Sequence, residues 1–535
     1  MDSAQQIKAA QELARSGQID KAANICKELT ARQLQCHEAW HLLGVIHNLS
    51  GHPADALKCI GQAIAIEPGI AKYHLNLGNA YLFLNQPHEA QSAYEKALEL
   101  DGDYQDAHFN LALLLRNLDD NRGAEFYFKK AVQGPAPMPG AWAQLAAIQE
   151  HENRLEEASR SVASGLALEP GNPLSVIVEA KLLRRKKQPA EALDRLLPLS
   201  HVRLSPRLSV GYYHEMGLLH DQLGQTDQAF EDFVRANQAQ FEDPAAQSIN
   251  PANYLLAIEQ LAEASFGENW RPHDVAENEP SPVFLIGFPR SGTTLLDQIL
   301  DSHPSIQTLE EIPIILSLVK EYESLAAESR PDREARRQIQ ARYFELVLAH
   351  INLLPSSTLI DKLPLNINTV PLIVRVFPNA RFILALRHPL DVCLSCFMQP
   401  FGPNEVMLNF ARLDSTAQLY HHTMRLWLRA ERELGLRVHR IRYEDMVRDF
   451  DGEVGCLLAF LGLPWDDKVR DFAAHAAGRG RINTPSYHQV TRPLNRDAVY
   501  RWKRYERQLA PIIPVLAPYF REFGYENEPS DSVDS

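Results

Sequence analysis

The sequence lacks several features that mark whole classes of protein. Six cysteines in 535 residues are too few for a disulfide framework, which indicates a reducing compartment. No run approaches the roughly 18 uninterrupted apolar residues of a membrane-spanning helix. The opening MDSAQQIKAAQELARSGQ has neither the basic nor the apolar region of a secretory signal. We therefore expect a cytoplasmic protein with no membrane partner.

Excess positive charge is also missing. Lys and Arg number 54 against 68 Asp and Glu, which gives a net charge of −14. Because a nucleic-acid backbone selects for a strong basic excess, we expect no nucleic-acid partner. Cys393 and Cys396 have the spacing of metal ligands, but no second pair accompanies them. We interpret both as packed cysteines and expect no metal.

What the sequence does contain is ordinary globular composition. Hydrophobic residues make up 45% and charged residues 23%, which excludes disordered and fibrous classes. At about 150 residues per domain, the chain is long enough for at least two separate cores.

An internal period of 34 residues runs through the first part of the chain. A small residue recurs at that period, at Ala22, Ala56, Ala90, Ala124, Ala158 and Ala192. A second series of small residues comprises Gly44, Gly78, Ala112 and Ala146, and helix breakers separate the units. Each unit is therefore predicted to be two helices that cross closely at small residues.

This pattern resembles the tetratricopeptide repeat. The match is specific over residues 37–170, weaker over 3–36 and 173–200, and offset by a short insertion near 209–240. The resemblance implies a right-handed superhelix in which each unit buries its apolar face on its neighbours. A groove that binds a protein or peptide is one interpretation, and a dimerisation or spacer element is the other.

Downstream, the chain has the pattern of a buried strand, a glycine-bearing turn and a helix. Val283 to Ile286 are apolar, and the turn runs from Gly287 to Thr294. Such a turn directs backbone N–H groups and a helix dipole at one place, which predicts an anion site. Thr293 stands where nucleotide-triphosphate loops carry a lysine, so a kinase is disfavoured.

The loop from Phe288 to Thr294 resembles the 5′-phosphosulfate loop of sulfotransferases. Over about 282–525 the chain is similar to the protein-tyrosine sulfotransferases. The resemblance implies transfer of a sulfuryl group from 3′-phosphoadenosine 5′-phosphosulfate (PAPS) to an acceptor hydroxyl, that of protein tyrosine, without a metal. The fold class expected is an all-α tetratricopeptide superhelix followed by an α/β P-loop-like domain with a mainly parallel sheet. We predict a repeat array over 1–240, a helical linker over 241–281, the sulfotransferase domain over 282–525 and an acidic tail over 526–535.

The resemblance also implies roles for individual residues. It makes Glu311 the catalytic base, with Glu310 as the alternative, and Lys362 the cation at the transferring group. A tyrosine hydroxyl has a pKa near 10, so a carboxylate must accept its proton. Arg290 and Ser486 would stabilise developing charge. The residues implied to bind the nucleotide are Arg290, Ser291, Gly292, Thr293, Thr294, Arg387, Ser395, Tyr443, Ser486, Arg492, Asn495 and Arg501.

Two departures from the family pattern leave the acceptor open. Gln399 stands in place of a second basic ligand of the 3′-phosphate. Ile312 to Ile314 follow Glu311 without the arginine with which the animal enzymes meet an acidic peptide. Sulfation of a small molecule or glycan, and a repeat scaffold with a vestigial nucleotide site, therefore remain alternatives.

Overall fold

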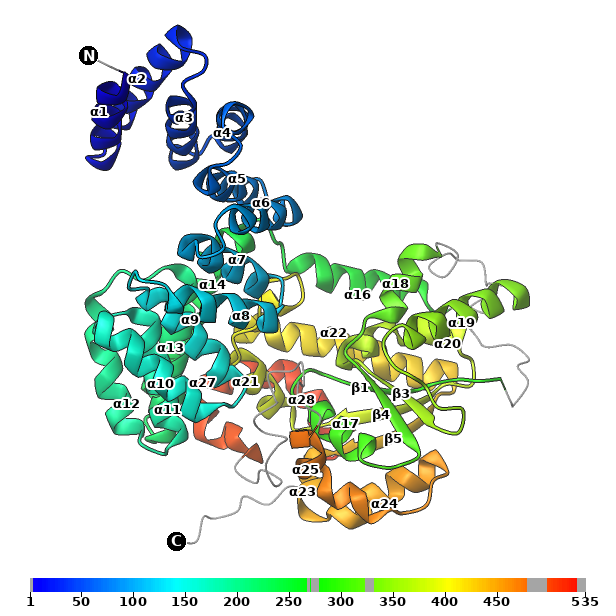
Figure 1. Cartoon of the computed structure of the whole chain (residues 1–535). Coiled ribbons are helices and arrows are strands. Elements are labelled where there is room, and N and C mark those ends of the chain that lie inside the picture. The colour runs from blue at the N-terminus through cyan, green and yellow to red at the C-terminus, as the bar shows by residue number, and fades with distance from the viewer. Residues whose placement is uncertain (1–2, 267–269, 271–278, 323–331, 479–497, 527–535) are drawn as a thin grey trace. The chain divides into compact units, whose positions relative to one another are not determined.

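The protein is described here by a computed structural model that covers residues 3–266, 270, 279–322, 332–478 and 498–526. The chain divides into two compact units, Met1–His201 and Val202–Ser535. The first unit is helical, and the second combines helices with a sheet (Figure 1). Among the described residues, no helix has the length and apolarity needed to cross a membrane.

The first unit consists of helix pairs that repeat along the chain. The helices are α1 (Ser3–Arg15), α2 (Ile19–Arg32), α3 (His37–Leu49), α4 (Pro53–Ile66), α5 (Ala71–Phe83), α6 (Pro87–Leu100), α7 (Gln105–Asn117), α8 (Asn121–Gln133), α9 (Pro139–His151), α10 (Leu155–Leu168), α11 (Pro173–Arg185) and α12 (Pro189–Leu196), followed by the 3-10 helix η1 (Leu197–His201). From α3 to α11, the first helices of successive pairs begin 34 residues apart. The predicted two-helix unit is therefore confirmed.

A left-handed backbone position recurs at the turn inside each pair. The residues with positive φ there are Gly17, Gly51, Asn85, Asp119, Asn153 and Lys187. The next amide closes the helix, as Gln86 N does by donating to Tyr81 O at 3.0 Å. Glycine and asparagine accept this conformation readily, whereas Lys187, with φ 61°, does so at a steric cost.

Small residues allow the two helices of a pair to approach closely. A Cβ added at Gly78 would lie 2.5 Å from Tyr94 Cε1, and one at Gly44 would lie 2.5 Å from Ile60 Cγ1. Both distances are far below van der Waals contact, so the recurring glycine is a packing requirement.

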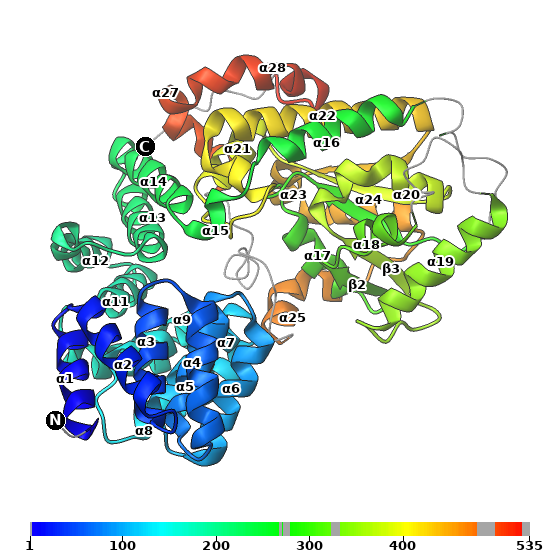
Figure 2. The same cartoon turned by 90° about the horizontal axis from the view of Figure 1, so that it is seen from above.

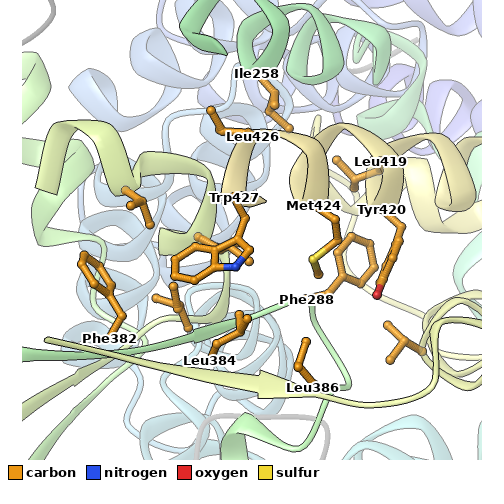
Figure 3. Close-up of a cluster of buried hydrophobic side chains, with 14 of the residues drawn as sticks. Ile258, Phe288, Phe382, Leu384, Leu386, Leu419, Tyr420, Met424, Leu426 and Trp427 are labelled. Atoms are coloured by element: carbon orange, nitrogen blue, oxygen red, sulfur yellow. The ribbon is translucent and has the colours of Figure 1, made fainter. Parts of the chain in front are cut away.

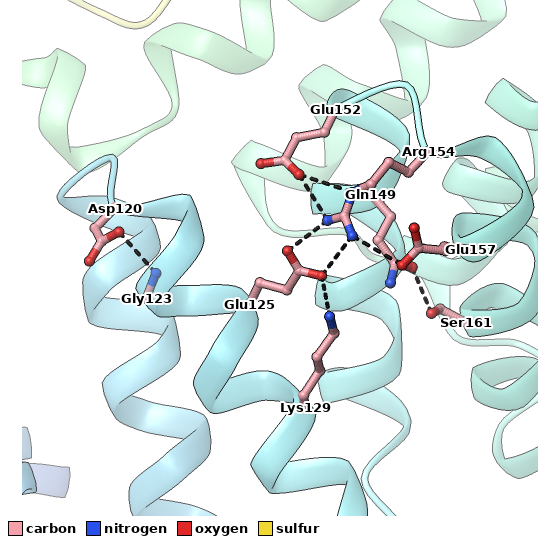
Figure 4. Close-up of polar contacts among 9 residues, drawn as sticks. All are labelled: Asp120, Gly123, Glu125, Lys129, Gln149, Glu152, Arg154, Glu157 and Ser161. Atoms are coloured by element: carbon pink, nitrogen blue, oxygen red, sulfur yellow. Dashed lines mark hydrogen bonds and ion pairs between the residues drawn. The ribbon is translucent and has the colours of Figure 1, made fainter. Parts of the chain in front are cut away.

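Ion pairs connect neighbouring pairs of helices in this unit. Figure 4 shows the Arg154 guanidinium among three carboxylates, with Nη2 2.7 Å from Glu125 Oε2 and 2.8 Å from Glu152 Oε2. Glu125 lies in α8 and Arg154 immediately precedes α10, so the contact joins successive repeats.

The second unit is organised around a five-stranded parallel sheet. Its strands are β1 (Val283–Gly287), β2 (Ile306–Glu310), β3 (Thr358–Lys362), β4 (Arg381–Leu386) and β5 (Arg437–Arg442). The strand order is β2-β3-β1-β4-β5, and every pairing is parallel. Strands β2 and β3 lie on one side of β1, and β4 and β5 lie on the other. The strand order therefore reverses at β1, which is the topological switch point of the sheet.

Helices cover both faces of the sheet. On one face, Val283 and Leu285 pack against a core that includes α17 (Thr293–Asp301), α23 (Tyr443–Arg448) and α24 (Phe450–Leu461). On the other, Phe284 and Ile286 pack towards the long helix α22 (Leu413–Leu434). Figure 3 shows Trp427 of α22 above Leu384 of β4 on this second face.

Further helices complete the second face. They are α16 (Ala252–Ala264), α18 (Ile314–Glu321), α19 (Arg333–Leu348), η4 (Pro364–Thr369), α20 (Val370–Val376), α21 (Pro389–Phe397), η5 (Met407–Ala411), α27 (Glu506–Leu509), η9 (Ala510–Ile512) and α28 (Ile513–Glu522). The helix expected between 241 and 281 is α16, which lies beside α22 (Figure 2). The second unit also contains α15 (Pro244–Gln247), η6 (Asp467–Asp471), α25 (Phe472–Gly478) and η8 (Arg501–Tyr505).

One helix pair with a repeat pattern belongs to the second unit. It consists of α13 (Pro206–Gln222) and α14 (Thr226–Phe241). Phe233 of α14 is part of the same hydrophobic core as β1, and the Phe230 ring stacks on Phe397 at 5.1 Å. The compact units therefore divide between His201 and Val202, whereas the domain boundary expected from the repeats, at residue 240, stays a prediction.

Candidate active site

Candidate site residues occur at or directly after the carboxyl ends of all five strands. Glu310 ends β2, Lys362 ends β3, the glycine-bearing loop follows β1, Arg387 follows β4 and Tyr443 follows β5. Because the strands are parallel, these ends share one edge of the sheet, where ligands of open α/β sheets bind.

The loop between β1 and α17 is fixed by its glycines and by burial. Gly292 has φ 98° and caps α17, whose first two residues, Thr293 and Thr294, are buried. A Cβ at Gly287 would lie 2.7 Å from Ala385 O, so only glycine fits beside β4. The loop thus presents the first N–H groups of a helix, which have no intrahelical acceptor.

Arg290 joins the loop to the segment after β4. Its Nε donates to Ser395 Oγ at 3.1 Å, and Arg387 Nη1 donates to Arg290 O at 3.4 Å. Burial, together with the nearby Arg387 and Arg501, lowers the pKa of Arg290 to about 10, so the group is still a cation at neutral pH. The two motifs that the sequence separates by 97 residues are therefore in direct contact.

Several buried polar atoms in this region lack a hydrogen-bond partner among the described residues. They include Ser291 Oγ, Arg387 Nε and Arg501 Nε, together with Trp502 Nε1 and the carboxylate oxygen Asp391 Oδ2. Buried donors of this kind are rare in folded proteins and need an explanation. Because two of them are guanidinium N–H groups, an anionic ligand such as a phosphate fits them.

Tyr443 lies against the loop. A Cβ at Gly292 would be 3.2 Å from Tyr443 Cδ2, and the Arg387 guanidinium lies 5.3 Å from the centre of the same ring. The Tyr443 ring therefore lies between the glycine-bearing loop and the Arg387 guanidinium. This is the position expected for an aromatic side chain that contacts a nucleotide.

Lys362 forms the second cluster, on the other side of β1. Its Nζ lies 2.8 Å from Glu311 Oε1 and 3.3 Å from Glu310 Oε1. The lysine is completely buried. Burial alone would lower its pKa, but the carboxylates of Asp297, Glu311 and Glu310 outweigh that effect and raise it, so Lys362 is protonated. Leu285 of β1 pairs in register with Lys362, which places this ammonium near the end of the loop-bearing strand.

Backbone strain is concentrated at the same edge. Beyond the repeat turns, the described non-glycine residues with positive φ are Arg290 at 71°, Glu311 at 55° and Tyr500 at 53°. A left-handed conformation costs such residues about 1–2 kcal/mol, and strain of this kind clusters at functional sites. Two of the three are residues expected to take part in catalysis.

Sequence reasoning missed the buried acids behind Arg387. Asp391 Oδ1 accepts from Trp502 N at 2.8 Å, and Asp391 Oδ2 lies 3.9 Å from Arg387 Nη2. Burial raises the pKa of Asp391 to about 6. Glu444 Oε1 accepts from His388 N at 2.8 Å. Arg387 lies before α21 begins at Pro389, so no helical spacing in the sequence indicated its contact with Asp391.

The two cysteines of α21 are packed, as expected. Cys393 and Cys396 are fully buried, and burial raises the pKa of both thiols. Cys396 Sγ donates to Pro289 O at 3.3 Å, so it supports the loop. The remaining expected site residues, Ser486, Arg492 and Asn495, lie outside the described residues.

Family comparisons match the two parts of the chain to two different families. Residues 282–467 match the Sulfotransferase family. The Tetratricopeptide repeat matches at 7–71, 71–104, 105–133 and 210–243.

Individual relatives are distant. An uncharacterized protein of Aquifex aeolicus is 27% identical over 412 residues, which are 72% of this chain and 51% of that protein. This chain thus spans about half the length of that relative. Protein-tyrosine sulfotransferase 1 of Danio rerio is 26% identical over 283 residues, or 47% of this chain and 75% of the relative. The crystal structure of MamA aligns with a TM-score of 0.28 at 20% identity, over 30% of this chain and 95% of MamA.

Proposed function

Because the chain joins tetratricopeptide repeats to a sulfotransferase-family domain, we propose that it transfers a sulfuryl group from PAPS to the hydroxyl of a protein tyrosine. One observation carries the proposal: an anion-binding loop on the central strand lies between a Lys–Glu pair on one side and an arginine on the other. These are the groups that such a transfer needs, and they share one edge of the sheet.

The donor would be bound at both of its phosphates. The N–H groups that begin α17 would hold the 5′-phosphosulfate, together with the unpartnered Ser291 hydroxyl. Arg387 and Ser395 would hold the 3′-phosphate, with Arg290 bridging the two ends through its contact to Ser395. Tyr443 would lie against the nucleotide. Ser486, Arg492 and Asn495 belong to the same proposal.

Glu311 is the better candidate for the base. Both glutamates contact Lys362, but the Glu311 side chain is 31% exposed and that of Glu310 is 15% exposed. A base must reach the proton of an incoming hydroxyl. Lys362 is buried beneath the pair, where its positive charge would stabilise the charge that develops on the leaving oxygen.

The bound donor supplies an activated sulfuryl group, whose bond to the 5′-phosphate breaks as a bond to the acceptor oxygen forms. The chain's own contribution is to orient both partners, to accept the hydroxyl proton on Glu311 and to hold Lys362 beside the reacting group. The Thr293 position argues against phosphoryl transfer from ATP, because the loop lacks the lysine that contacts a triphosphate.

A protein acceptor is favoured by two observations. The Danio rerio relative is named a protein-tyrosine sulfotransferase, and repeat arrays of this kind bind proteins or peptides. A small phenol or glycan is the alternative acceptor. A cytoplasmic location is part of the proposal, since all six cysteines are described and each is free.

Calorimetric titration separates the donor classes. We expect adenosine 3′,5′-bisphosphate to bind the full-length protein and ATP–Mg²⁺ to bind far more weakly. Tighter binding of ATP–Mg²⁺, or no binding of the bisphosphate, would overturn the assignment of the donor.

Transfer of label from ³⁵S-PAPS then tests the acceptor. A tyrosine-containing peptide is expected to be labelled, whereas its phenylalanine counterpart is not. Labelling of a simple phenol with no labelling of the peptide would favour the small-molecule alternative.

A further inference from the structure

The last helix pair with a repeat pattern contributes a carboxylate to the edge of the nucleotide site. Asp221 lies near the end of α13, and its Oδ2 accepts from Arg501 Nη2 at 2.8 Å. Its Oδ1 accepts from the Tyr505 hydroxyl at 2.7 Å and lies 3.5 Å from Arg504 Nη2. The Asp221 side chain is 11% exposed, so this is a partly desolvated contact, in which a charged hydrogen bond is stronger than at the surface.

The contact to Asp221 engages Nη2 of the Arg501 guanidinium and leaves its buried Nε without an acceptor among the described residues. A guanidinium has five donors in a rigid fork, so fixing one side of it fixes the direction of the rest.

The backbone next to Arg501 is tied to the phosphate segment. Trp502 N donates to Asp391 Oδ1 at 2.8 Å, and Asp391 lies in the first turn of α21, four residues after Arg387. The Trp502 ring stacks on His388 with centroids 5.0 Å apart. Arg501 is therefore held from both sides, by Asp221 through its side chain and by α21 through the adjacent amide.

The same helix pair also contacts the other end of α21. Asn237 Nδ2 of α14 donates to Phe397 O at 2.9 Å, two residues after Ser395. The pair is thus in contact with two elements that carry expected phosphate-binding residues, both within the second unit.

We propose that Asp221 is a positioning residue for nucleotide binding: it orients Arg501 so that the remaining N–H of the guanidinium faces a phosphate of the bound nucleotide. This inference rests on the proposed function, since it assumes that the anion at the sheet edge is the donor nucleotide. A helix pair that the repeat pattern assigns to the binding array then supplies part of the transferase site.

The test is a double-mutant cycle on the full-length protein, with adenosine 3′,5′-bisphosphate as the titrant. Asp221→Ala is expected to weaken binding about tenfold, the effect of misaligning one charged hydrogen bond. Arg501→Ala should weaken it by at least as much. In the Arg501→Ala background, adding Asp221→Ala should change the affinity by less than about twofold, because the aspartate acts through the arginine.

Asp227→Ala is the matched control. Asp227 is also an aspartate of this helix pair and contacts the same C-terminal segment, at 2.6 Å from Arg507 Nη2, but it lies on the surface. It should leave the affinity unchanged. Urea unfolding of each variant reports any general loss of stability.

Three results would overturn the inference. An Asp221→Ala effect of equal size in the Arg501→Ala background would make Asp221 merely structural. Tighter binding by Asp221→Ala would mean that Asp221 competes with the phosphate. An unchanged affinity in Asp221→Ala would remove the role altogether. Failure of the parent protein to bind the bisphosphate would instead refute the proposed function, so the two failures are distinguishable.

Discussion

Glu311 and Lys362 are connected twice, once through the backbone and once through their side chains. Glu311 N donates to Lys362 O at 2.7 Å, and Lys362 Nζ donates to Glu311 Oε1 at 2.8 Å. The backbone bond holds Glu311 in its left-handed conformation just past the end of β2. The carboxylate that we propose as the base is therefore placed by the strand that carries the cation.

The first prediction concerns that carboxylate. Glu311→Gln keeps the size and hydrogen-bonding capacity of the side chain but removes the proton acceptor, so turnover should fall roughly 100-fold or more. Affinity for adenosine 3′,5′-bisphosphate should remain, because the nucleotide-binding residues are untouched. Labelled transfer and calorimetry measure the two quantities.

Glu310→Gln is the control for this prediction, because Glu310 also contacts Lys362 and is the less exposed of the pair. We expect it to retain most of the turnover. If Glu310→Gln lost activity while Glu311→Gln kept it, the base would be Glu310.

The second prediction concerns Arg387. Arg387→Ala should weaken bisphosphate binding roughly 10- to 100-fold, the loss expected for one charge-assisted hydrogen bond to phosphate. Arg381→Ala is its counterpart at the other end of β4, where Arg381 Nη1 donates to Leu461 O at 2.9 Å. This control should lose some stability but no affinity. Equal losses of affinity in both variants would contradict an anion site at the carboxyl edge.

The third prediction is a pH dependence of stability that originates at Asp361. This carboxyl is fully buried, with one oxygen accepting from the Tyr343 hydroxyl at 2.7 Å. Burial raises the pKa of Asp361 to about 7. The pKa of an Asp in the unfolded chain is about 3.9. The folded protein therefore holds the Asp361 proton more tightly than the unfolded chain does. The stabilisation of the fold by this proton is complete below about pH 4 and is lost as the pH rises through about 7.

Asp361→Asn should remove this pH dependence, because the amide stays neutral at every pH. The new amide N–H also finds an acceptor: the side chain of Asn366 contacts position 361, and its Oδ1 has no partner among the described residues. Relative to the parent, the variant should gain about 2–3 kcal/mol in unfolding free energy between pH 5 and pH 8, because the parent loses about 1.4 kcal/mol for each pH unit up to about pH 7. Urea unfolding at the two pH values measures it. A gain that is no larger at pH 8 than at pH 5 would refute the assignment.

The fourth prediction tests the turn geometry of the repeats. Lys187→Gly should stabilise the repeat unit by about 1 kcal/mol, because glycine adopts a φ of 61° without the steric cost that lysine bears. Lys186→Gly, one position earlier at φ −78°, should instead destabilise by about 0.5–1 kcal/mol. Thermal unfolding followed by circular dichroism compares them, and shifts of the same sign in both would argue against the turn assignment.

Much of the fold could be predicted because its signals are local. The 34-residue period follows from small residues at helix crossings such as Gly78, and it reappears in the helix starts. The loop after β1 was recognisable because its glycines, hydroxyls and arginine lie within eight consecutive residues, from Gly287 to Thr294. Parallel pairing follows in turn from strands that alternate with helices.

The site was only partly predictable, because its remaining members depend on long-range packing. Nothing near Asp221 in the sequence indicates that it meets Arg501, 280 residues away. Asp297 raises the pKa of Lys362 from within α17, and nothing in the local sequence around Asp297 indicates that contact. Such groups are chosen by the tertiary fold, so a local pattern cannot reveal them.

The shared core of α14 and β1 determines where the transferase could be separated from the repeats. A fragment that begins at residue 282, where the sulfotransferase match begins, would lack Phe233 and the Phe230–Phe397 stack. A fragment that begins at Val202 would keep the whole of this core. The shorter set of repeats before Val202 is therefore the part that could be removed or exchanged without opening the core of the transferase.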